Sequence, residues 1–340
     1  MGNALPGGSF RARNGTALHP VHMTQERGAA VGDYRAPLFL AWQLTNRCAC
    51  KCLHCCEESG PDKLWPDEMD RDQALNFTRQ IVEMQIPYVA FGGGEPLGVP
   101  HVWEIFEILH QGGVEIKIET NGLLIDEAAA DRLKALEVAC VQISLDGATA
   151  KIHESVRPEG PFKGALDSLK RLARRGLAPE LVFVPTRLNV DAAPAVYDLA
   201  MKAGARTFVT GPLMRLGRAA AAWESLAPAP QAWERAVLAL KNRAQFHKDA
   251  VRLSIYPWGI QEEMKVRLQS PQAMMLVVPN GRVKLLNALP FSVADLKRQT
   301  LAQGWPAVAR GWKNPKVREF IEKAIADASL LKHANECWDI

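Results

Sequence analysis

The sequence predicts an α/β fold built on a parallel sheet. Between residues 36 and 210, apolar stretches of strand length alternate with stretches of helical period. Such alternation is typical of parallel strands joined by right-handed helical crossovers. Six strand–helix units are fewer than a closed eight-fold barrel needs, so the pattern alone fits a partial barrel and an open doubly wound sheet equally well. The expected strands are 37–44, 87–91, 114–120, 138–145, 180–185 and 206–210.

The helices follow from apolar spacing and from their end signals. In 71–85, Ala74, Leu75 and Ile81 share one face, and Asp70 is a suitable N-cap. An apolar stripe in 162–173 ends before Gly176. Further helices are expected at 102–112, 126–136 and 193–204.

Beyond residue 246 the rhythm changes. Residues 273–286 predict a hairpin around Asn280-Gly281, and 315–334 predict a terminal helix. We therefore expect three regions: a flexible N-terminal tail (1–35), an α/β core (36–245) and a C-terminal extension (246–340).

Composition narrows the class of protein. Of 340 residues, 48% are apolar, and 41 basic residues against 37 acidic ones leave a net charge of only +4. A surplus this small gives no reason to expect a nucleic-acid partner. No apolar run reaches the length of a membrane span, and no secretory signal begins the sequence, so we expect a cytoplasmic protein without a membrane partner.

The cysteines are clustered rather than spread. Five of seven lie in "NRCACKCLHCCEESG", after the first expected strand. Cys48, Cys52 and Cys55 have the spacing C-x3-C-x2-C, which suits three irons of a 4Fe–4S cluster and leaves the fourth iron open. Zinc and unliganded thiols are the alternatives, although a closed zinc site needs a fourth ligand and usually a second C-x2-C pair. Cys50 and Cys56 fall outside this spacing, and packing is the simpler interpretation of both.

Five further segments follow the cysteines in order, and together they carry a family resemblance. They are "GGGEP" (92–96), "ETNG" (119–122), "ISLDG" (143–147), "HESVRPEGPF" (153–162) and "LMRLGRA" (213–219). This series resembles the radical S-adenosylmethionine (radical SAM) superfamily, in the subgroup with a SPASM-type C-terminal extension. The resemblance covers roughly residues 38 to 220. It implies a partial (β/α)6 TIM-like barrel with a SPASM-like cap.

The resemblance also implies cofactors and their ligands. One 4Fe–4S cluster would be bound by Cys48, Cys52 and Cys55, with S-adenosyl-L-methionine on the open iron. Simpler interpretations remain: a strand-end turn for the glycines, an Asn-Gly turn, loop packing for the histidine and a surface arginine. The residues implied to bind S-adenosyl-L-methionine are His54, Gly93, Gly94, Glu95 (bracing the loop), Asn121, Ser144 and Arg157 (on its carboxylate).

The implied reaction is reductive cleavage of S-adenosyl-L-methionine to a 5′-deoxyadenosyl radical, which abstracts hydrogen from a substrate. A reductant such as flavodoxin or ferredoxin would supply the electron. The leading substrate hypothesis is a peptide or amino-acid-derived natural-product precursor. Radical tailoring of a small molecule such as a tetrapyrrole or aminoglycoside is the alternative, and a non-catalytic metal or electron-transfer protein is the rival class.

The sequence departs from the SPASM pattern in its extension. Residues 246–336 contain no cysteine, so we expect a degenerate, cysteine-poor extension and a single cluster. Cys337 is the candidate hydrogen donor, with an incidental thiol as the simpler interpretation. Cys140, inside an expected strand, is interpreted as a structural thiol.

Overall fold

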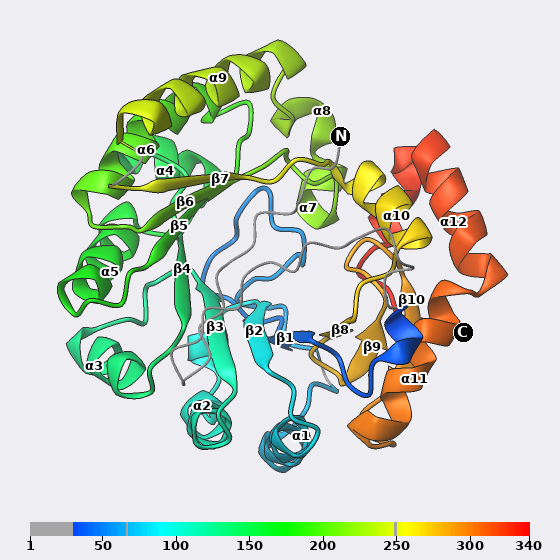
Figure 1. Ribbon diagram of the computed structural model, residues 1–340. Helices are drawn as coiled ribbons and strands as arrows, with labels where there is room; N and C mark the ends of the chain where they lie inside the picture. The colour runs from blue at the N-terminus through cyan, green and yellow to red at the C-terminus, as the bar shows by residue number, and fades with distance from the viewer. Residues whose placement is uncertain (1–29, 66, 248–249) are drawn as a thin grey trace.

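The strands of the protein form one continuous, curved sheet (Figure 1). The computed structural model describes residues 30–65, 67–247 and 250–340. Within these residues the strand order is β11-β10-β9-β8-β1-β2-β3-β4-β5-β6-β7. The strands are β1 (Phe39–Thr45), β2 (Tyr88–Gly93), β3 (Glu115–Thr120), β4 (Cys140–Ser144), β5 (Glu180–Phe183), β6 (Thr207–Thr210), β7 (Arg252–Ile255), β8 (Met274–Val277), β9 (Arg282–Lys284), β10 (Phe291–Asp295) and β11 (Trp338–Asp339).

The pairing of these strands confirms the predicted partial barrel. Strands β1 to β7 pair in parallel and in chain order, and all six strands expected from the sequence are present. The sheet does not close: β7 and β11 are its edges within the described residues. The sequence analysis did not foresee β7, whose short "RLSI" segment lacks a strong apolar pattern.

The helices surround the outer face of this sheet (Figure 1). Helix α1 begins at the predicted N-cap, because the Asp70 carboxylate accepts from the Gln73 backbone N–H at 2.9 Å. The helices are α1 (Arg71–Glu83), α2 (Val102–Gln111), α3 (Glu127–Ala135), α4 (Ala150–Val156), α5 (Phe162–Arg174), α6 (Ala193–Lys202), α7 (Gly217–Ala221), α8 (Trp223–Leu226), α9 (Pro230–His247), α10 (Ile260–Gln269), α11 (Leu301–Trp312) and α12 (Pro315–Ala326). No helix in the described ranges has the length and apolarity to cross a bilayer.

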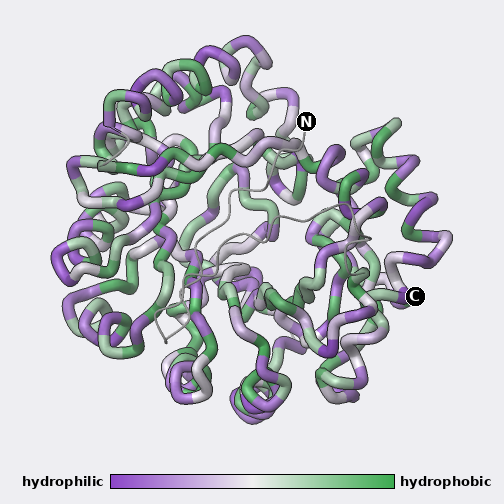
Figure 2. Tube along the Cα trace, in the orientation of Figure 1, coloured by the Kyte–Doolittle hydropathy of each residue, from purple (hydrophilic) through white to green (hydrophobic). Residues whose placement is uncertain are grey.

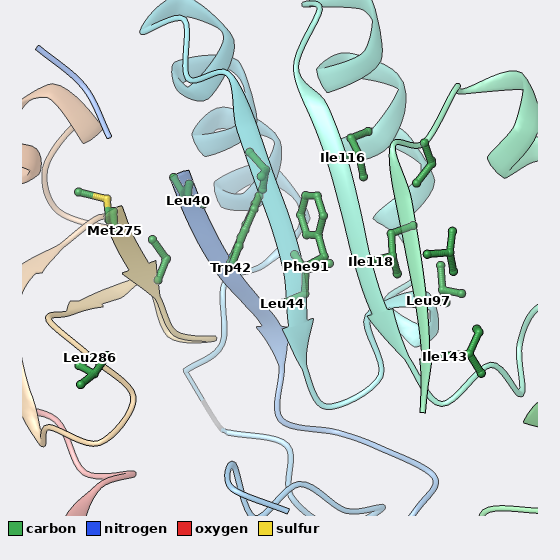
Figure 3. Packing of buried hydrophobic residues seen from close by; sticks show 14 of the residues in the cluster. Leu40, Trp42, Leu44, Phe91, Leu97, Ile116, Ile118, Ile143, Met275 and Leu286 are labelled. Carbon is green, nitrogen blue, oxygen red and sulfur yellow. The ribbon is translucent and has the colours of Figure 1, made fainter. Parts of the chain in front are cut away.

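The main core lies between the sheet and these helices. The rings of Trp42 (β1) and Phe77 pack edge to face, with their centroids 4.7 Å apart. The rings of Phe91 (β2) and Phe106 also pack edge to face, with centroids 5.0 Å apart. Figure 3 shows Leu40, Trp42 and Phe91 in this layer, and Figure 2 shows hydrophilic positions along the peripheral helices. Burying each such side chain stabilises the fold by about 1.5–3 kcal/mol. Packing therefore fixes strands β1 and β2, from which the cysteine loop and the glycine loop emerge.

The opposite face of the sheet is polar. On β3, Ile116 and Ile118 are buried toward the helices, whereas Lys117 and Glu119 alternate onto the inner face. The Lys117 Nζ lies 3.3 Å from the Glu119 Oε1, and Gln142 Nε2 donates to Glu180 at 3.4 Å. A closed barrel fills this space with branched apolar side chains. Here the polar inner face suits a cavity that holds water or a ligand.

The C-terminal region joins the same sheet rather than standing apart. Strand β8 pairs in parallel with β1, and β8 and β9 form the predicted hairpin, whose Gly281 has a φ of +80°. The terminal helix predicted at 315–334 ends at Ala326, where a 3-10 helix (Ala328–His333) follows. Of the predicted tail, residues 1–29 lie outside the described residues, and Trp305 donates to the Tyr34 carbonyl at 2.8 Å.

Candidate functional site

A cavity of about 600 Å³ lies at the carboxyl ends of the parallel strands, where the motif loops meet. The cysteine loop follows β1, the glycine loop follows β2, and the Asn121 and Ser144 segments end β3 and β4. Because parallel strands end at the same edge of the sheet, residues far apart in the sequence become neighbours there, such as Cys52 and Arg157, which are 105 positions apart. The predicted site residues that line this cavity are Cys48, Cys52, His54, Cys55, Gly93, Gly94, Asn121, Ser144 and Arg157.

Two of the three predicted metal ligands accept hydrogen bonds from N–H donors. The Cys48 sulfur accepts from the Cys50 backbone N–H at 3.4 Å and from Asn121 Nδ2 at 3.7 Å. The Cys52 sulfur accepts from Arg157 Nη1 at 3.5 Å. Donors of this kind favour the thiolate, which is the form that binds metal.

The pKa values of these thiols follow from their surroundings. A hydrogen bond from the Cys50 thiol, supported by the Arg157 charge and opposed by burial, lowers the pKa of Cys52 to about 6. The Cys50 thiol also lowers the pKa of Cys48, whereas burial raises the pKa of Cys55. Cys50, outside the ligand spacing, is buried and lies between the two thiols whose pKa is lowered.

The glycine loop holds the cysteine loop by close backbone contact. Gly94 N–H donates to the Thr45 carbonyl at 2.7 Å, and Glu95 N–H donates to the Arg47 carbonyl at 2.9 Å. A Cβ on Gly94 would lie 2.7 Å from the Arg47 carbonyl carbon, and Gly93 has a φ of +96°. The sequence analysis assigned this close approach to a ligand. In the structure, the absence of a Cβ on Gly94 is already required for the glycine loop to pack against the backbone of the cysteine loop.

Glu95 braces the loops, as predicted from its motif. Its buried carboxylate accepts from Thr120 Oγ1 at 2.7 Å, from the Asn121 N–H at 3.0 Å and from the Leu97 N–H at 3.2 Å. Burial raises its pKa, and these three donors act against that effect. A single carboxylate therefore joins the ends of β2 and β3. It does not line the main cavity.

Arg157 is held by a buried ion pair. Its Nε lies 2.5 Å from the Asp146 Oδ2, and its Nη2 lies 3.3 Å from the His54 Nε2. Asp146 has no exposed surface and also accepts from the Val184 N–H at 2.7 Å. Burial, together with the Arg157 charge and partly offset by Asp146, lowers the pKa of His54 to about 4, so the imidazole is neutral at pH 7. Asp146, to which the sequence analysis assigned no role, thus positions the predicted ligand residues Arg157 and His54.

The "LMRLGRA" segment clamps the cysteine loop from the other side. Arg218 Nε donates to the Cys52 carbonyl at 2.7 Å, and its Nη2 donates to the Ser59 carbonyl at 2.7 Å. Gly217 has a φ of +50°, and a Cβ there would lie 2.6 Å from the Cys55 carbonyl oxygen. The sequence marked this segment by resemblance but assigned Arg218 no role. Its partners are carbonyl groups about 160 residues away, which leave no pattern in the sequence.

Two buried polar atoms at the cavity have no hydrogen-bond partner within the described residues. They are His54 Nδ1 and Thr210 Oγ1, and both residues line the cavity. A buried polar group without a partner costs about 1–3 kcal/mol, so a bound polar ligand would relieve this cost. The residues present therefore fit a polar cofactor beside the three thiols. Thr210 was not singled out from the sequence.

Cys337 is not brought to this cavity. Its charged neighbours are Lys284 and Arg282 of β9, and it is absent from the lining residues. The nearby Asn335 instead reaches the cysteine loop, donating to the Cys56 carbonyl and to Glu58, each at 2.9 Å. In the part of the chain that the structure describes, no three His, Cys, Asp or Glu side chains converge on a single metal-ion position.

Comparison with known proteins shows a family likeness. The model of the radical SAM superfamily matches residues 42–189, which span the cysteine loop, the glycine loop and the Asp146–Arg157 pair. In these residues the chain is similar to the radical SAM superfamily.

Two kinds of curated relative share this radical SAM region. The mycofactocin maturase MftC of Mycobacterium ulcerans (strain Agy99) is 39% identical over 194 residues, which are 57% of this chain and 52% of the relative. An AdoMet-dependent heme synthase of Methanosarcina barkeri (strain Fusaro / DSM 804) is 25% identical over 292 residues, covering 79% of this chain and 82% of the relative. The chain thus spans about half the length of the maturases that it matches.

Solved radical SAM structures share the fold. SuiB of Streptococcus suis bound to S-adenosylmethionine superposes with a TM-score of 0.68 at 13% identity, over 88% of this chain and 76% of SuiB. The structure of anSMEcpe with bound AdoMet gives a TM-score of 0.60 at 17% identity, over 84% and 83%. Both likenesses cover more of the chain than residues 42–189.

Proposed function

We propose that this protein is a radical SAM enzyme whose single 4Fe–4S cluster is bound by Cys48, Cys52 and Cys55. The observation that carries the proposal is the meeting, in one cavity, of these three thiols with the unpartnered His54 Nδ1 and Thr210 Oγ1. When bound, the cluster and S-adenosyl-L-methionine supply one-electron cleavage of a carbon–sulfur bond and a radical that abstracts hydrogen from the substrate.

The residues of the chain prepare the site for that chemistry. Asn121 and Arg157 direct N–H groups at the thiols, which stabilises their negative charge. His54 stays neutral and offers a nitrogen to a bound ligand. Ser144 places a hydroxyl in the cavity. Packing of the strands against the helices keeps these groups in place and limits the access of water.

We further propose a peptide substrate. The identity to MftC and the fold shared with SuiB, one of whose structures is bound to the precursor peptide SuiA, support this class. The inner face of the sheet offers Lys117, Glu119 and Gln142 to polar groups of the substrate at the floor of the cavity. Modification of a tetrapyrrole is the second candidate, favoured by the heme synthase relative of which the chain covers 82%.

A reductant such as flavodoxin or ferredoxin would provide the electron. All seven cysteines are free thiols in the structure, which fits a reducing compartment and supports a cytoplasmic location. Cys337, outside the cavity lining, has no support as the hydrogen donor.

Anaerobic reconstitution tests the enzyme proposal. We expect about four irons per chain, the content of one cubane cluster, and release of 5′-deoxyadenosine from S-adenosyl-L-methionine under dithionite. Cys52→Ser should abolish both. Cys140→Ser, which changes a thiol in β4 outside the cavity, should abolish neither. Iron binding without cleavage would favour the non-catalytic alternative, and zinc in place of iron would contradict the proposal.

The substrate proposal has its own test. Deuterium in 5′-deoxyadenosine after incubation with deuterated precursor peptides, and its absence with deuterated porphyrins, would support the peptide class. The reverse labelling pattern would favour the tetrapyrrole candidate. A hydrogen donor would act after this abstraction, so Cys337 needs a different readout: solvent-derived hydrogen in the product that is lost in Cys337→Ser would support the hydrogen-donor hypothesis.

A further inference from the structure

The outer side of the cysteine loop borders a second hollow, of about 470 Å³. Cys48 lines both this outer hollow and the main cavity, and it is only half-buried. One predicted cluster ligand is therefore reached from the outside of the protein without passing through the substrate cavity.

Exposed cations gather beside this outer hollow, around Gly60. Arg47 pairs with Gly60 as a β-bridge, and a Cβ on Gly60 would lie 3.4 Å from the Lys63 Cγ and 3.9 Å from the Lys51 Cγ. All three cations are exposed, and none forms an ion pair with a residue in the described ranges. Asp62 is the exposed acid between them, and Glu68 lines the hollow itself, so the Gly60 cation patch (Arg47, Lys51 and Lys63) keeps a positive surplus of one charge over these two acids.

Apolar side chains open onto the same hollow. Leu64 is 56% exposed and Leu124 is 50% exposed, and both line it. Leucines exposed to this degree beside exposed cations resemble a small interface with an apolar centre and a polar rim. The exposed surfaces of these two leucines do not pack against the core.

We propose that this surface, formed by the Gly60 cation patch with Leu64 and Leu124, docks a small acidic electron-carrier protein. The inference rests on the proposed function, because only the cleavage reaction requires an electron. The carrier is oxidised by one electron and the cluster is reduced by one, and no covalent bond forms or breaks in this step. Cys48, which belongs to both hollows, is the ligand nearest the docked carrier.

The charge of the patch favours an acidic carrier protein over the N-terminal residues 1–29 as the binding partner of this surface. Residues 1–29 contain Arg11, Arg13 and Arg27 against the single acid Glu26. A segment with that surplus is repelled by the Gly60 cation patch, whereas an acidic carrier is attracted and steered toward it. Attraction between exposed charges also falls as salt rises, because the Debye length shortens to about 3 Å at 1 M ionic strength.

The test uses a charge-reversal variant and a matched control. Lys51→Glu with Lys63→Glu reverses two charges of the patch. Lys316→Glu with Arg318→Glu reverses two exposed charges on α12, away from the cysteine loop. Binding of an acidic flavodoxin to the reconstituted protein is measured by calorimetry at low and high salt. Release of 5′-deoxyadenosine is measured with reduced flavodoxin and, separately, with dithionite.

We expect the patch variant to bind flavodoxin at least roughly tenfold more weakly than the control at low salt, with the difference disappearing at high salt. Flavodoxin-supported cleavage should fall likewise, and dithionite-supported cleavage should not change. Equal binding by patch variant and control would overturn the proposal. So would a concentration-dependent dimer that the patch variant abolishes, since a second copy would then cover the surface. Failure of wild-type cleavage under dithionite would instead refute the proposed function, while the binding measurement would still decide the docking site.

Discussion

Replacing Gly94 by alanine tests whether close contact between two loops holds the site together. The new Cβ would press against the Arg47 carbonyl oxygen and lie 2.7 Å from its carbon. Carbon atoms in contact are normally 3.5–4.0 Å apart, so the backbone must move by roughly 0.8 Å or more. No flexible side chain can yield, because the obstructing atoms are backbone.

The cost follows from what this movement disturbs. Overpacking costs about 1–3 kcal/mol. The bonds from Gly94 N–H to Thr45 and from Glu95 N–H to Arg47 are each worth about 0.5–1.5 kcal/mol. We therefore expect Gly94→Ala to lose about 2–6 kcal/mol of the free energy of unfolding. Displacement of Arg47, the residue before Cys48, should also lower the iron bound after reconstitution.

Gly92→Ala is the matched control on the same loop. Its Cβ would meet only the Glu119 Oε2, at 3.4 Å, and that side-chain end can move. We expect a change within about 1 kcal/mol and normal iron content. Urea unfolding followed by tryptophan fluorescence, with iron analysis of the same preparations, measures both effects. The reasoning fails if Gly94→Ala is as stable and as iron-loaded as Gly92→Ala.

Three further variants test the contacts around the cysteine loop. Asp146→Asn leaves the buried Arg157 without its counter-charge. We expect the free energy of unfolding, measured in urea, to fall by about 3–5 kcal/mol. A fall of less than about 1 kcal/mol would show that the ion pair is not effectively buried. Arg218→Lys cannot donate to two carbonyl groups at once. We expect the reconstituted variant to release iron to a chelator several-fold faster, and an unchanged release rate would exclude a clamping role. Asn335→Ala removes two hydrogen bonds worth about 0.5–1.5 kcal/mol each. Limited proteolysis should cut the cysteine loop sooner, and unchanged cleavage would show that the tail does not restrain it.

Those parts of the fold that depend on local pattern were predictable. The six core strands, the α1 cap at Asp70 and the Asn280-Gly281 turn are each specified by residues near them in the chain. Strand β7 was missed because its stability comes from pairing with β6 rather than from its own composition. The terminal helix was predicted too long, since a residue pattern does not show where Asp327 ends the helix and caps the following 3-10 turn.

The candidate site also has features that local sequence pattern predicted and features that depend on the tertiary structure. Motif spacing identified the thiols and the bracing role of Glu95. Spacing did not indicate that Arg218 holds backbone carbonyls, that Asp146 pairs with Arg157, or that Thr210 lacks a partner. Those facts depend on which segments the sheet brings together, and a carbonyl partner carries no residue signature. The hydrogen-donor role of Cys337 stays a prediction, since the structure shows only that this thiol does not line the main cavity.

The pairing of β8 with β1 determines which part of the cavity wall can move. Four register pairs join these strands, so separating them would break a ladder of backbone hydrogen bonds. Strand β7 is different: within the described residues it has a hydrogen-bonded neighbour on one side only, and the chain leaves it through residues 256–259 to α10. Displacing α10 outward at this edge breaks no ladder bonds, whereas displacing β7 would break its four register pairs with β6. If the cavity widens to admit a long chain, the least costly movement is at this edge, while the wall beside the thiols stays rigid.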